Sequence, residues 1–404
     1  SETDPAGETT RLDYDPMGRL IRVTDAMGYQ TSHTYDQAGN QITQTDAMGR
    51  ITSWNYDADG NVLSRTLPLG QTEHKQWDGN GNLIRYVDFK GQTQTFAYDK
   101  EDRLLEHAWE NGSVHYTYGA NGYPISVSTP TRLTTYSYDL VDRIVRLEQP
   151  EGWIAYDYDA AGNRSLIQTI NGSTAYAYDE QNRLTEVQDS ELGTTTYTYL
   201  PSGQRATRTL PSDLTTTYLY DVRNIISEII LNDGDQVLDR VQYSIGPAGN
   251  ITDEIHMSGL NRHFEYDSLY RLIREQTSDP VRGDQQTNWT YDPVGNRLTE
   301  TKQGITLAAI FDDNDRILSQ GQQLFTYDDN GNTISISDDT GTAYLNYDPL
   351  NRLVQQETEA ALATYTYKAD GIRTAATIDG IATTYLIDPT QRHAQILEER
   401  TAGN

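Results

Sequence analysis

Acidic side chains are the residues of this chain that most invite a chemical role. Two acidic stretches, Asp57-Ala-Asp-Gly-Asn61 and Asp328-Asp-Asn-Gly-Asn332, superficially resemble calcium-binding loops. The helix-flanked calcium loop requires Gly at its sixth position and Glu at its twelfth. Other residues hold both positions in each stretch. We therefore expect ordinary turns here and no bound calcium.

Catalytic chemistry finds no better support. Adjacent carboxylates such as Asp312-Asp313 and Asp338-Asp339 have the composition of an acid–base pair, but they fall where the chain is expected to turn. The seven histidines never adopt the paired spacing of zinc sites. The chain contains no Cys, no Gly-x-Ser-x-Gly elbow, no phosphate-binding loop and no dinucleotide fingerprint. We predict no enzymatic activity, no metal site and no cofactor.

A repeat is the informative feature of the sequence. An aromatic residue recurs at steps of 20 or 21 residues along almost the whole chain, which is typical of a repeat array and not of a conventional enzyme domain. We call these positions the aromatic slots and predict a structural role for them. They are Tyr14, Tyr35, Tyr56, Trp77, Tyr98, Tyr118, Tyr138, Tyr158, Tyr178, Tyr199, Tyr220, Tyr266, Tyr291, Tyr327, Tyr347 and Tyr367, with Tyr243, Phe311 and the degenerate Ile387 completing nineteen.

Each aromatic slot is followed by a turn signal. Asp comes next in 15 of 19 repeats, and its carboxylate can accept backbone N–H bonds two residues on. Four residues after the slot, 16 of 19 repeats carry Gly, Asn or Asp, which tolerate positive φ; Pro247, Tyr270 and Gln391 break the rule. We predict a three-residue hairpin turn with a bulge, which we call the slot turn. Its predicted structural residues include Asp15, Gly18, Asp36, Gly39, Asp57, Gly60, Asp159, Gly162, Asp292, Gly295, Asp328 and Gly331.

A second turn, which we call the return turn, lies about half a repeat later, as at Asp25-Ala-Met-Gly28 and Asn111-Gly112. The segments between turns are short and rich in Thr, Val, Ile and Tyr, as in residues 194–199, which is typical of strands. Each repeat of about 20 residues is thus one antiparallel hairpin, and nineteen hairpins predict about 38 strands. A second Tyr two residues before several slots leads us to expect rows of stacked rings across the sheet.

The composition predicts how this sheet is covered. Only 36% of the residues are hydrophobic, so the chain cannot supply the continuous apolar inner face that a two-layer sandwich needs. A sheet of this length must also twist and curl. We predict an all-β fold of tandem hairpins forming one long single-layer sheet that spirals into a hollow shell or cage. A rod-like β-solenoid is the alternative.

No composition shift or linker divides the chain, so we expect one repeat array over residues 1–404. Gly7 precedes Tyr14 by the same seven residues that separate Gly28 from Tyr35, so the array begins within a repeat. Residues 401–404 read as a further turn, and we expect an array truncated at both ends. Residues 221–291 are irregular, with steps of 23, 23 and 25 residues. This region reads either as a neutral surface insertion, which we favour, or as a longer loop for a partner.

The charge excludes some partners. A net charge of −28 repels nucleic-acid backbones and anionic membrane surfaces, and we expect no nucleic-acid partner. The sequence has no run of 18 apolar residues and no basic stretch followed by an apolar one, so we expect neither a membrane span nor a signal peptide within these residues. The absence of Cys fits either a cytosolic or a secreted bacterial protein.

The repeated text resembles a known family. The unit Tyr-Asp-x-x-Gly-Asn/Arg, seen in Tyr158-Asp-Ala-Ala-Gly-Asn-Arg164 and Tyr291-Asp-Pro-Val-Gly-Asn-Arg-Leu298, is similar to the YD (Rhs) repeat, and it covers essentially the whole chain. That family includes bacterial Rhs polymorphic toxins, the encapsulating component of Tc toxins, and teneurin adhesion receptors. The resemblance implies a spiral β-sheet that forms a hollow shell. In the bacterial members the shell holds a C-terminal toxin.

The resemblance sets the expected function. We expect a structural encapsulation module of a secreted or cell-surface bacterial toxin, exported as part of a larger protein. Its partners would be a C-terminal toxin domain of the same parent protein and a secretion or delivery apparatus. The family's junction motif, Asp-Pro-x-Gly-Leu, does not occur here, so self-cleavage is not carried over. The alternatives are a teneurin-like adhesion or display scaffold and a carbohydrate-binding array, whose candidate platforms would be Tyr116/Tyr118 and Tyr156/Tyr158.

Overall fold

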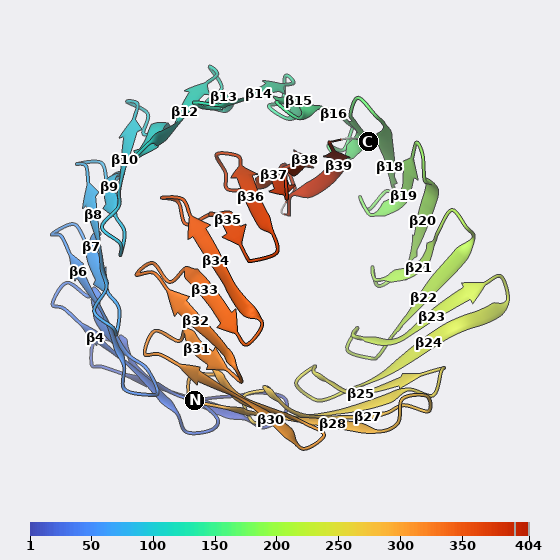
Figure 1. The fold of residues 1–404 in the computed structure, drawn as a ribbon. Helices are drawn as coiled ribbons and strands as arrows, with labels where there is room; N and C mark the ends of the chain where they lie inside the picture. The colour runs from blue at the N-terminus through green and yellow to red at the C-terminus, as the bar shows by residue number, and fades with distance from the viewer. Residues whose placement is uncertain (392, 403–404) are drawn as a thin grey trace. The chain divides into compact units, whose positions relative to one another are not determined.

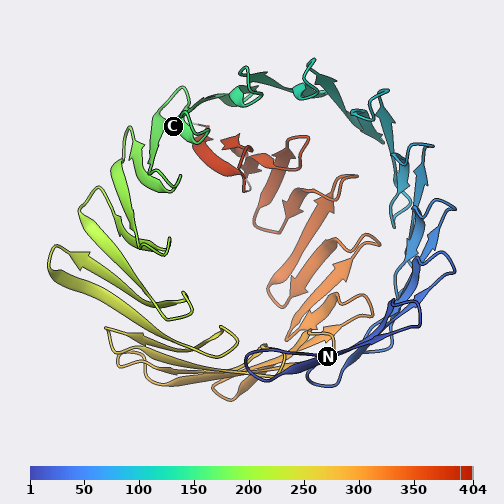
Figure 2. The same cartoon turned by 180° about the vertical axis from the view of Figure 1, so that it is seen from behind.

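The computed structural model describes residues 1–391 and 393–402, and these residues form 39 β-strands. Consecutive strands pair antiparallel within a 39-stranded sheet, and Figures 1 and 2 show one hairpin following the next. The predicted all-β array of antiparallel hairpins is confirmed. None of the described residues belongs to a helix long and apolar enough to cross a membrane. Of the turn predicted over residues 401–404, the last two residues lie outside the described part of the chain.

The strands are short and follow the repeat. The first thirteen are β1 (Glu2–Thr3), β2 (Thr9–Tyr14), β3 (Leu20–Thr24), β4 (Gln30–Tyr35), β5 (Gln41–Thr45), β6 (Ile51–Tyr56), β7 (Val62–Thr66), β8 (Thr72–Trp77), β9 (Leu83–Val87), β10 (Thr93–Tyr98), β11 (Leu104–Trp109), β12 (Gly112–Tyr118) and β13 (Pro124–Thr129). The next thirteen are β14 (Arg132–Tyr138), β15 (Ile144–Gln149), β16 (Gly152–Tyr158), β17 (Arg164–Gln168), β18 (Ser173–Tyr178), β19 (Leu184–Asp189), β20 (Gly193–Tyr199), β21 (Arg205–Thr209), β22 (Leu214–Tyr220), β23 (Ile226–Asp233), β24 (Gln236–Ile245), β25 (Ile251–His256) and β26 (Asn261–Tyr266). The last thirteen are β27 (Leu272–Ser278), β28 (Gln285–Tyr291), β29 (Arg297–Lys302), β30 (Ile305–Phe311), β31 (Ile317–Gln320), β32 (Gln323–Tyr327), β33 (Thr333–Asp338), β34 (Gly341–Tyr347), β35 (Leu353–Glu357), β36 (Leu362–Tyr367), β37 (Arg373–Ile378), β38 (Ile381–Asp388) and β39 (Gln395–Thr401).

The contacts of the chain group into two compact units, each built from segments that are distant in sequence. Unit 1 contains Ser1–His33, Thr45–Gly49 and Asp157–Ala309. Unit 2 contains Thr34–Gln44, Arg50–Tyr156 and Ile310–Asn404. The boundaries fall inside hairpins, and no linker marks them in the sequence. That residues 1–404 act as a single array stays a prediction.

Few apolar side chains in the described residues are buried. They are Val114, Leu147, Ile154, Tyr156, Ile167, Ala376, Leu386 and Ile387. Many other large apolar side chains are exposed, which is the consequence of a sheet wetted on both faces. The hydrophobic composition predicts this outcome.

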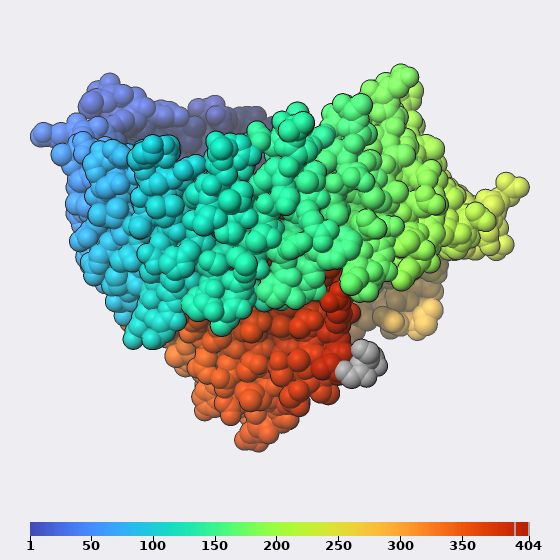
Figure 3. Space-filling view, turned by 90° about the horizontal axis from the view of Figure 1, so that it is seen from above, coloured from blue at the N-terminus to red at the C-terminus, as the bar shows by residue number. Residues whose placement is uncertain are grey.

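One cluster of buried apolar side chains lies in unit 2, where β38 packs against β15 and β16, and we call it the dry cluster. Leu147 and Ile154 are 0% exposed, and Leu386 is 1% exposed. Two buried hydrogen bonds accompany the cluster: Gln149 Nε2 donates to the Ile387 carbonyl at 3.0 Å, and Tyr156 Oη donates to Asp388 Oδ1 at 2.8 Å. Figure 3 shows the last residues, in red, directly against blue-green residues of the same unit. This cluster anchors the C-terminal hairpin.

The irregular region of unit 1 requires a correction. The slot predicted at Tyr243 is wrong, because the bulge and the slot turn follow Ile245: Ile245 pairs with Ile251, and Gly249 has φ +94°. The slot residue here is aliphatic, so the nearest aromatic residue, Tyr243, does not mark it. The true steps into and out of this slot are 25 and 21 residues, and the next is 25. The added length forms the long hairpin β23–β24, which reaches past its neighbours in Figure 1.

The dry cluster should dominate local stability. Replacing Ile154 by Ala removes a fully buried side chain and leaves a cavity, and we expect a loss of about 2–5 kcal/mol in the free energy of unfolding. The matched control is Ile305→Ala, at a side chain that is 78% exposed, where the change should stay within about 0.5 kcal/mol. Urea unfolding followed by circular dichroism measures both. Equal midpoints for the two variants would contradict the assignment.

Candidate functional site

The slot turns share one hydrogen-bond pattern, which the first of them illustrates. The Gly18 N–H donates to the Asp15 carbonyl and the Asp15 N–H donates to the Arg19 carbonyl, both at 2.9 Å. The Asp15 carboxylate then accepts the backbone N–H groups of Met17 and Arg19, both at 2.9 Å. Asp is therefore favoured after the slot because its side chain binds the donors that the turn would leave without partners.

The fourth position after the slot adopts the left-handed conformation that the sequence predicts. The six glycines named for it have positive φ: Gly18 (81°), Gly39 (99°), Gly60 (86°), Gly162 (92°), Gly295 (102°) and Gly331 (85°). A Cβ at Gly18 or Gly162 would meet nothing within 4 Å, so backbone conformation and not crowding selects Gly. Asp102 and Tyr270 adopt the same conformation, with φ of 59° and 61°. Tyr270 thus keeps the turn although its residue type breaks the rule.

The Asn or Arg at the fifth position closes the turn in two ways. Asn163 Nδ2 donates to Asp159 Oδ2 at 2.9 Å, and Arg103 Nε donates to Asp99 Oδ2 at 2.7 Å. The arginine goes further, because the Arg103 guanidinium lies 4.8 Å from the centre of the next slot ring, Tyr118. The same contact joins Arg183 to Tyr199, Arg271 to Tyr291, Arg316 to Tyr327 and Arg352 to Tyr367. The repeat text predicts rings stacked on rings, and it carries no signal for these guanidinium groups.

A ladder of hydrogen bonds links most of the aromatic slots to the repeat before them. Tyr98 Oη donates to the Leu83 carbonyl at 3.0 Å, and the Trp77 indole N–H donates to the Val62 carbonyl at 2.8 Å. The acceptor is the residue that faces the preceding slot across its bulge. The other donors and acceptors are Tyr56 and Gln41, Tyr118 and Leu104, Tyr138 and Pro124, Tyr178 and Arg164, Tyr199 and Leu184, Tyr220 and Arg205, Tyr266 and Ile251, Tyr291 and Leu272, Tyr327 and Ile317, and Tyr367 and Leu353.

The remaining predicted slots occupy the same place in their strands. Tyr14, Tyr35, Tyr158 and Tyr347 are the last residues of β2, β4, β16 and β34. Two of the candidate sugar platforms offer little to a ligand. Tyr156 is 2% exposed, and the Tyr118 hydroxyl donates to the Leu104 carbonyl.

The electrostatics of the slot turns follow from these bonds. The Asn163 side chain lowers the pKa of Asp159, and the Arg103 guanidinium lowers the pKa of Asp99. Burial raises the pKa of the slot hydroxyl of Tyr98. Because each carboxyl is more acidic in the folded turn, its contribution to stability is present at neutral pH and is lost as the pH falls from the ordinary value of 3.8 through the lowered one.

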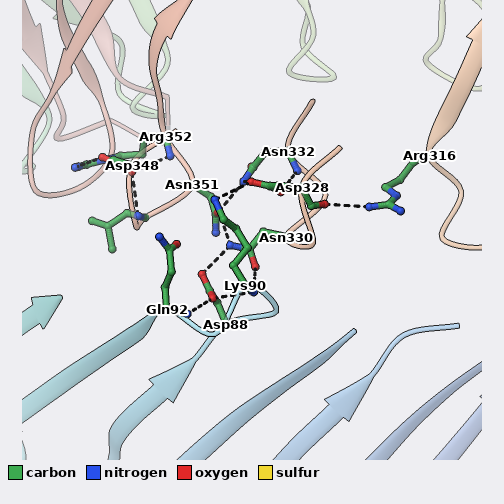
Figure 4. A network of polar contacts seen from close by, with 11 residues as sticks. Asp88, Lys90, Gln92, Arg316, Asp328, Asn330, Asn332, Asp348, Asn351 and Arg352 are labelled. Carbon is green, nitrogen blue, oxygen red and sulfur yellow. Dashed lines mark hydrogen bonds and ion pairs between the residues drawn. The ribbon is translucent and has the colours of Figure 1, made fainter. Parts of the chain in front are cut away.

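Slot turns also meet return turns of distant repeats within unit 2, as Figure 4 shows. Asn330 Nδ2 donates to Asp88 Oδ2 at 2.7 Å, and Lys90 Nζ lies 3.1 Å from Asp328 Oδ2. The Lys90 backbone N–H donates to Asn330 Oδ1 at 3.2 Å. Asn330 also donates to Asn351 of the next slot turn at 2.9 Å. Asp88 is 1% exposed, whereas the Lys90 side chain is 30% exposed, and we call this group of polar contacts the turn seam.

The turn seam recurs along unit 2, and unit 1 has an equivalent. In unit 2, Arg50 Nη2 lies 2.8 Å from Asp315 Oδ1, and Asn314 Nδ2 donates to Gln71 Oε1 at 3.0 Å. In unit 1, the Tyr270 hydroxyl bonds the Asp4 carboxylate. These partners are separated by 243 to 266 residues in sequence. The sequence does not predict these contacts, because the period and the turn residues describe only one repeat and its neighbours.

The acidic clusters serve the turns. The Asp312 carboxylate accepts the N–H groups of Asn314 and Arg316, and the Asp338 carboxylate accepts the Thr340 N–H. Within residues 1–391 and 393–402, no group of three or more His, Cys, Asp or Glu side chains is placed to hold a metal ion. The carboxylates of Asp312 and Asp338 therefore cap their turns.

Comparison with known families gives two matches. The teneurin YD-shell model matches residues 5–141 and 248–373, which together are more than half of the chain. The RHS repeat model matches residues 158–195. A curated relative, double-stranded DNA deaminase toxin A of Burkholderia cenocepacia (strain H111), is 29% identical over 125 residues, which cover 29% of this chain and 9% of the relative.

Solved structures share the fold. The crystal structure of TcdB2-TccC3-Cdc42 aligns with 99% of this chain at a TM-score of 0.70 and 16% identity, and the Photorhabdus luminescens Tc holotoxin pore aligns with 96% at 0.62 and 16%. The chain covers 27% of each of those chains. It therefore spans about a quarter of the structures it resembles and less than a tenth of the curated relative.

The hydroxyl ladder should be measurable one bond at a time. Tyr98→Phe keeps the ring and removes only the donor to Leu83, and we expect a loss of about 1 kcal/mol in the free energy of unfolding. Tyr344→Phe is the control, because this Tyr lies outside the slots and its ring is 57% exposed. Urea unfolding monitored by tyrosine and tryptophan fluorescence compares the two. If Tyr98→Phe is as stable as the control, the ladder contributes nothing.

The repeat text and the slot turn extend from the first repeat to the last described ones, and the hydroxyl ladder runs from Tyr56 to Tyr367. The matched family model covers both early and late repeats, and the solved structures reproduce the fold over nearly the whole chain. The chain belongs to the teneurin YD-shell family.

Proposed function

We propose that this chain is the wall-forming part of a secreted bacterial toxin, a β-shell that encloses a C-terminal toxin cargo carried by the same parent protein. The observation that carries the proposal is the likeness in fold, over 99% of the chain, to part of the TcdB2-TccC3 assembly. The curated relative supports it, because that protein is named as a toxin and is much longer than the segment it shares with this chain.

The chemistry of the repeats supports a structural role. In the slot turns, Asp side chains accept backbone N–H groups, and Asn or Arg side chains bond those carboxylates. The slot hydroxyls donate to backbone carbonyls. A wall made in this way needs little apolar core, and both of its faces can stay wet. We propose that the module itself performs no catalysis and that residues 1–404 act as one array.

The proposal fixes the kind of partners. The cargo would be a toxin domain outside these residues, and a net charge of −28 favours a basic or partly unfolded cargo over an acidic one. A secretion or delivery apparatus would be the second partner. The protein would then act outside the producing cell, as part of a larger exported chain.

A second candidate rests on the family itself. The matching model describes a teneurin shell, and the sequence resemblance includes teneurin adhesion receptors. In that case the shell is a scaffold for display, and the long hairpin β23–β24 is the feature best placed for contact with a partner. Binding of the purified chain to cells, lost when residues 232–239 are shortened to an ordinary return turn, distinguishes this candidate.

Protease protection of the parent protein tests enclosure. We expect the C-terminal segment to resist cleavage in the intact parent protein and to be cut rapidly when expressed alone. Opening the turn seam with Asn330→Ala and Lys90→Ala together should expose it, because both contacts to the return turn at Asp88 are lost.

The matched control is Asn80→Ala. Asn80 holds the same position in its slot turn and bonds Asp102 of the next turn, as Asn330 bonds Asn351. Protection should survive this change. Equal cleavage rates for the C-terminal segment in the parent protein and on its own would overturn the enclosure proposal.

A further inference from the structure

Lys368 reverses the charge at a position that the repeat reserves for Asp. It directly follows the slot Tyr367, where 15 of 19 repeats carry Asp, and it is the basic exception among them. The turn keeps its usual backbone bonds, since the Lys368 N–H donates to the Ile372 carbonyl at 2.9 Å and the Gly371 N–H donates to the Lys368 carbonyl at 3.1 Å. The backbone therefore does not require the lysine.

The Lys368 side chain is buried with little compensating charge. The residue is 6% exposed, and its ammonium lies 3.4 Å from Asp370, a carboxylate that is itself 45% exposed. Glu151 is near, but it is held by Arg132 through two bonds of 2.7 and 2.6 Å. Burial lowers the pKa of Lys368, and the Arg132 charge lowers it further against the opposing effects of Asp370 and Glu151.

A cavity of about 400 Å³ adjoins this lysine within unit 2, a volume in the range of small-ligand sites. Its lining includes the rings of Trp109 and Tyr367, the hydroxyls of Ser113 and Thr129, the cations Arg352 and Lys368, and the carboxylates Glu110 and Asp348, of which Glu110 is exposed. Arg352 is engaged by Asp348 at 2.6 Å and donates to the Lys368 carbonyl at 3.0 Å, which holds this side of the cavity in place. The lining thus combines two cations, two carboxylates, hydroxyl groups and two aromatic rings, and because Arg352 is paired with Asp348, Lys368 is the cation best placed to meet an added anion.

We propose that this cavity binds a small oxyanion, a phosphate or a carboxylate, whose charge is neutralised by the Lys368 ammonium. An anion at this place supplies the Lys368 ammonium with a second negative charge beside that of the half-exposed Asp370, and the hydroxyls of Ser113 and Thr129 are donors suited to its oxygens. The net charge of −28 repels anions from the chain as a whole, so an anion site must depend on local cationic groups such as Lys368.

Thermal unfolding in inorganic phosphate and, separately, in acetate tests the site, each against chloride at equal ionic strength. Phosphate stabilises many proteins by exclusion from their surfaces, so the informative signal is a saturable rise in melting temperature beyond that background. We expect a rise of about 2 °C when the anion reaches ten times its dissociation constant. Comparison of the two anions identifies which oxyanion the cavity prefers.

Four variants make the result specific. Lys368→Gln and Lys368→Asp, which restores the residue usual in the repeat, should keep the linear background and lose the saturable rise. Lys368→Arg keeps the charge and should retain it, and Lys100→Gln, at a side chain that is 89% exposed, should behave as the parent. Identical increments in all variants, or no saturable rise with either anion, would overturn the proposal and leave Lys368 as a counter-charge for Asp370 and Glu151. Neither result bears on whether the shell encloses a cargo.

Discussion

The bond from a slot hydroxyl to a carbonyl of the preceding repeat is the interaction on which the rest of this structure depends. It joins hairpins that are adjacent in the sheet at their slot-turn ends, where the bulge interrupts the strand ladder. That place needs an apolar cover for the turn and a hydrogen-bond donor for the carbonyl. An aromatic ring with a polar tip supplies both. Trp77 donates to the Val62 carbonyl through its indole N–H. The position therefore requires a hydrogen-bond donor at the right distance from the backbone and not a tyrosine as such.

The slot turn makes this bond repeatable. Asp caps the turn, a left-handed residue closes it, and Asn or Arg ties the carboxylate from the other side. Where the fifth residue is Arg, its guanidinium also covers the next slot ring, so one side chain couples two repeats. Such a lattice stabilises through many bonds of about 1 kcal/mol each and needs little buried apolar surface. This is why a chain with 36% hydrophobic residues folds as a single layer.

Much of this architecture can be read from the sequence, because it is local and periodic. The period predicts the hairpins, and Gly162 or Asp102 at a fixed distance from the slot predicts the turn. The slot at Ile245 could not be predicted from an aromatic period, because the backbone reverses wherever the turn residues allow it, whatever residue occupies the slot. The turn seam was also missed, because Asn330 and Asp88 are 242 residues apart and neither departs from what an ordinary turn would carry. Lys368 was visible as an exception, but its burial was not.

Both the hydrogen-bond ladder and the proposed enclosure require that each repeat is stabilised mainly by the repeats next to it in the sheet. Hydrogen exchange followed by mass spectrometry on the parent and on Tyr199→Phe tests it directly. The account predicts faster exchange confined to the hairpin of Tyr199 and the adjoining one that contains the Leu184 acceptor, with distant repeats unchanged. Faster exchange spread evenly over the chain, or no change at all, would contradict it.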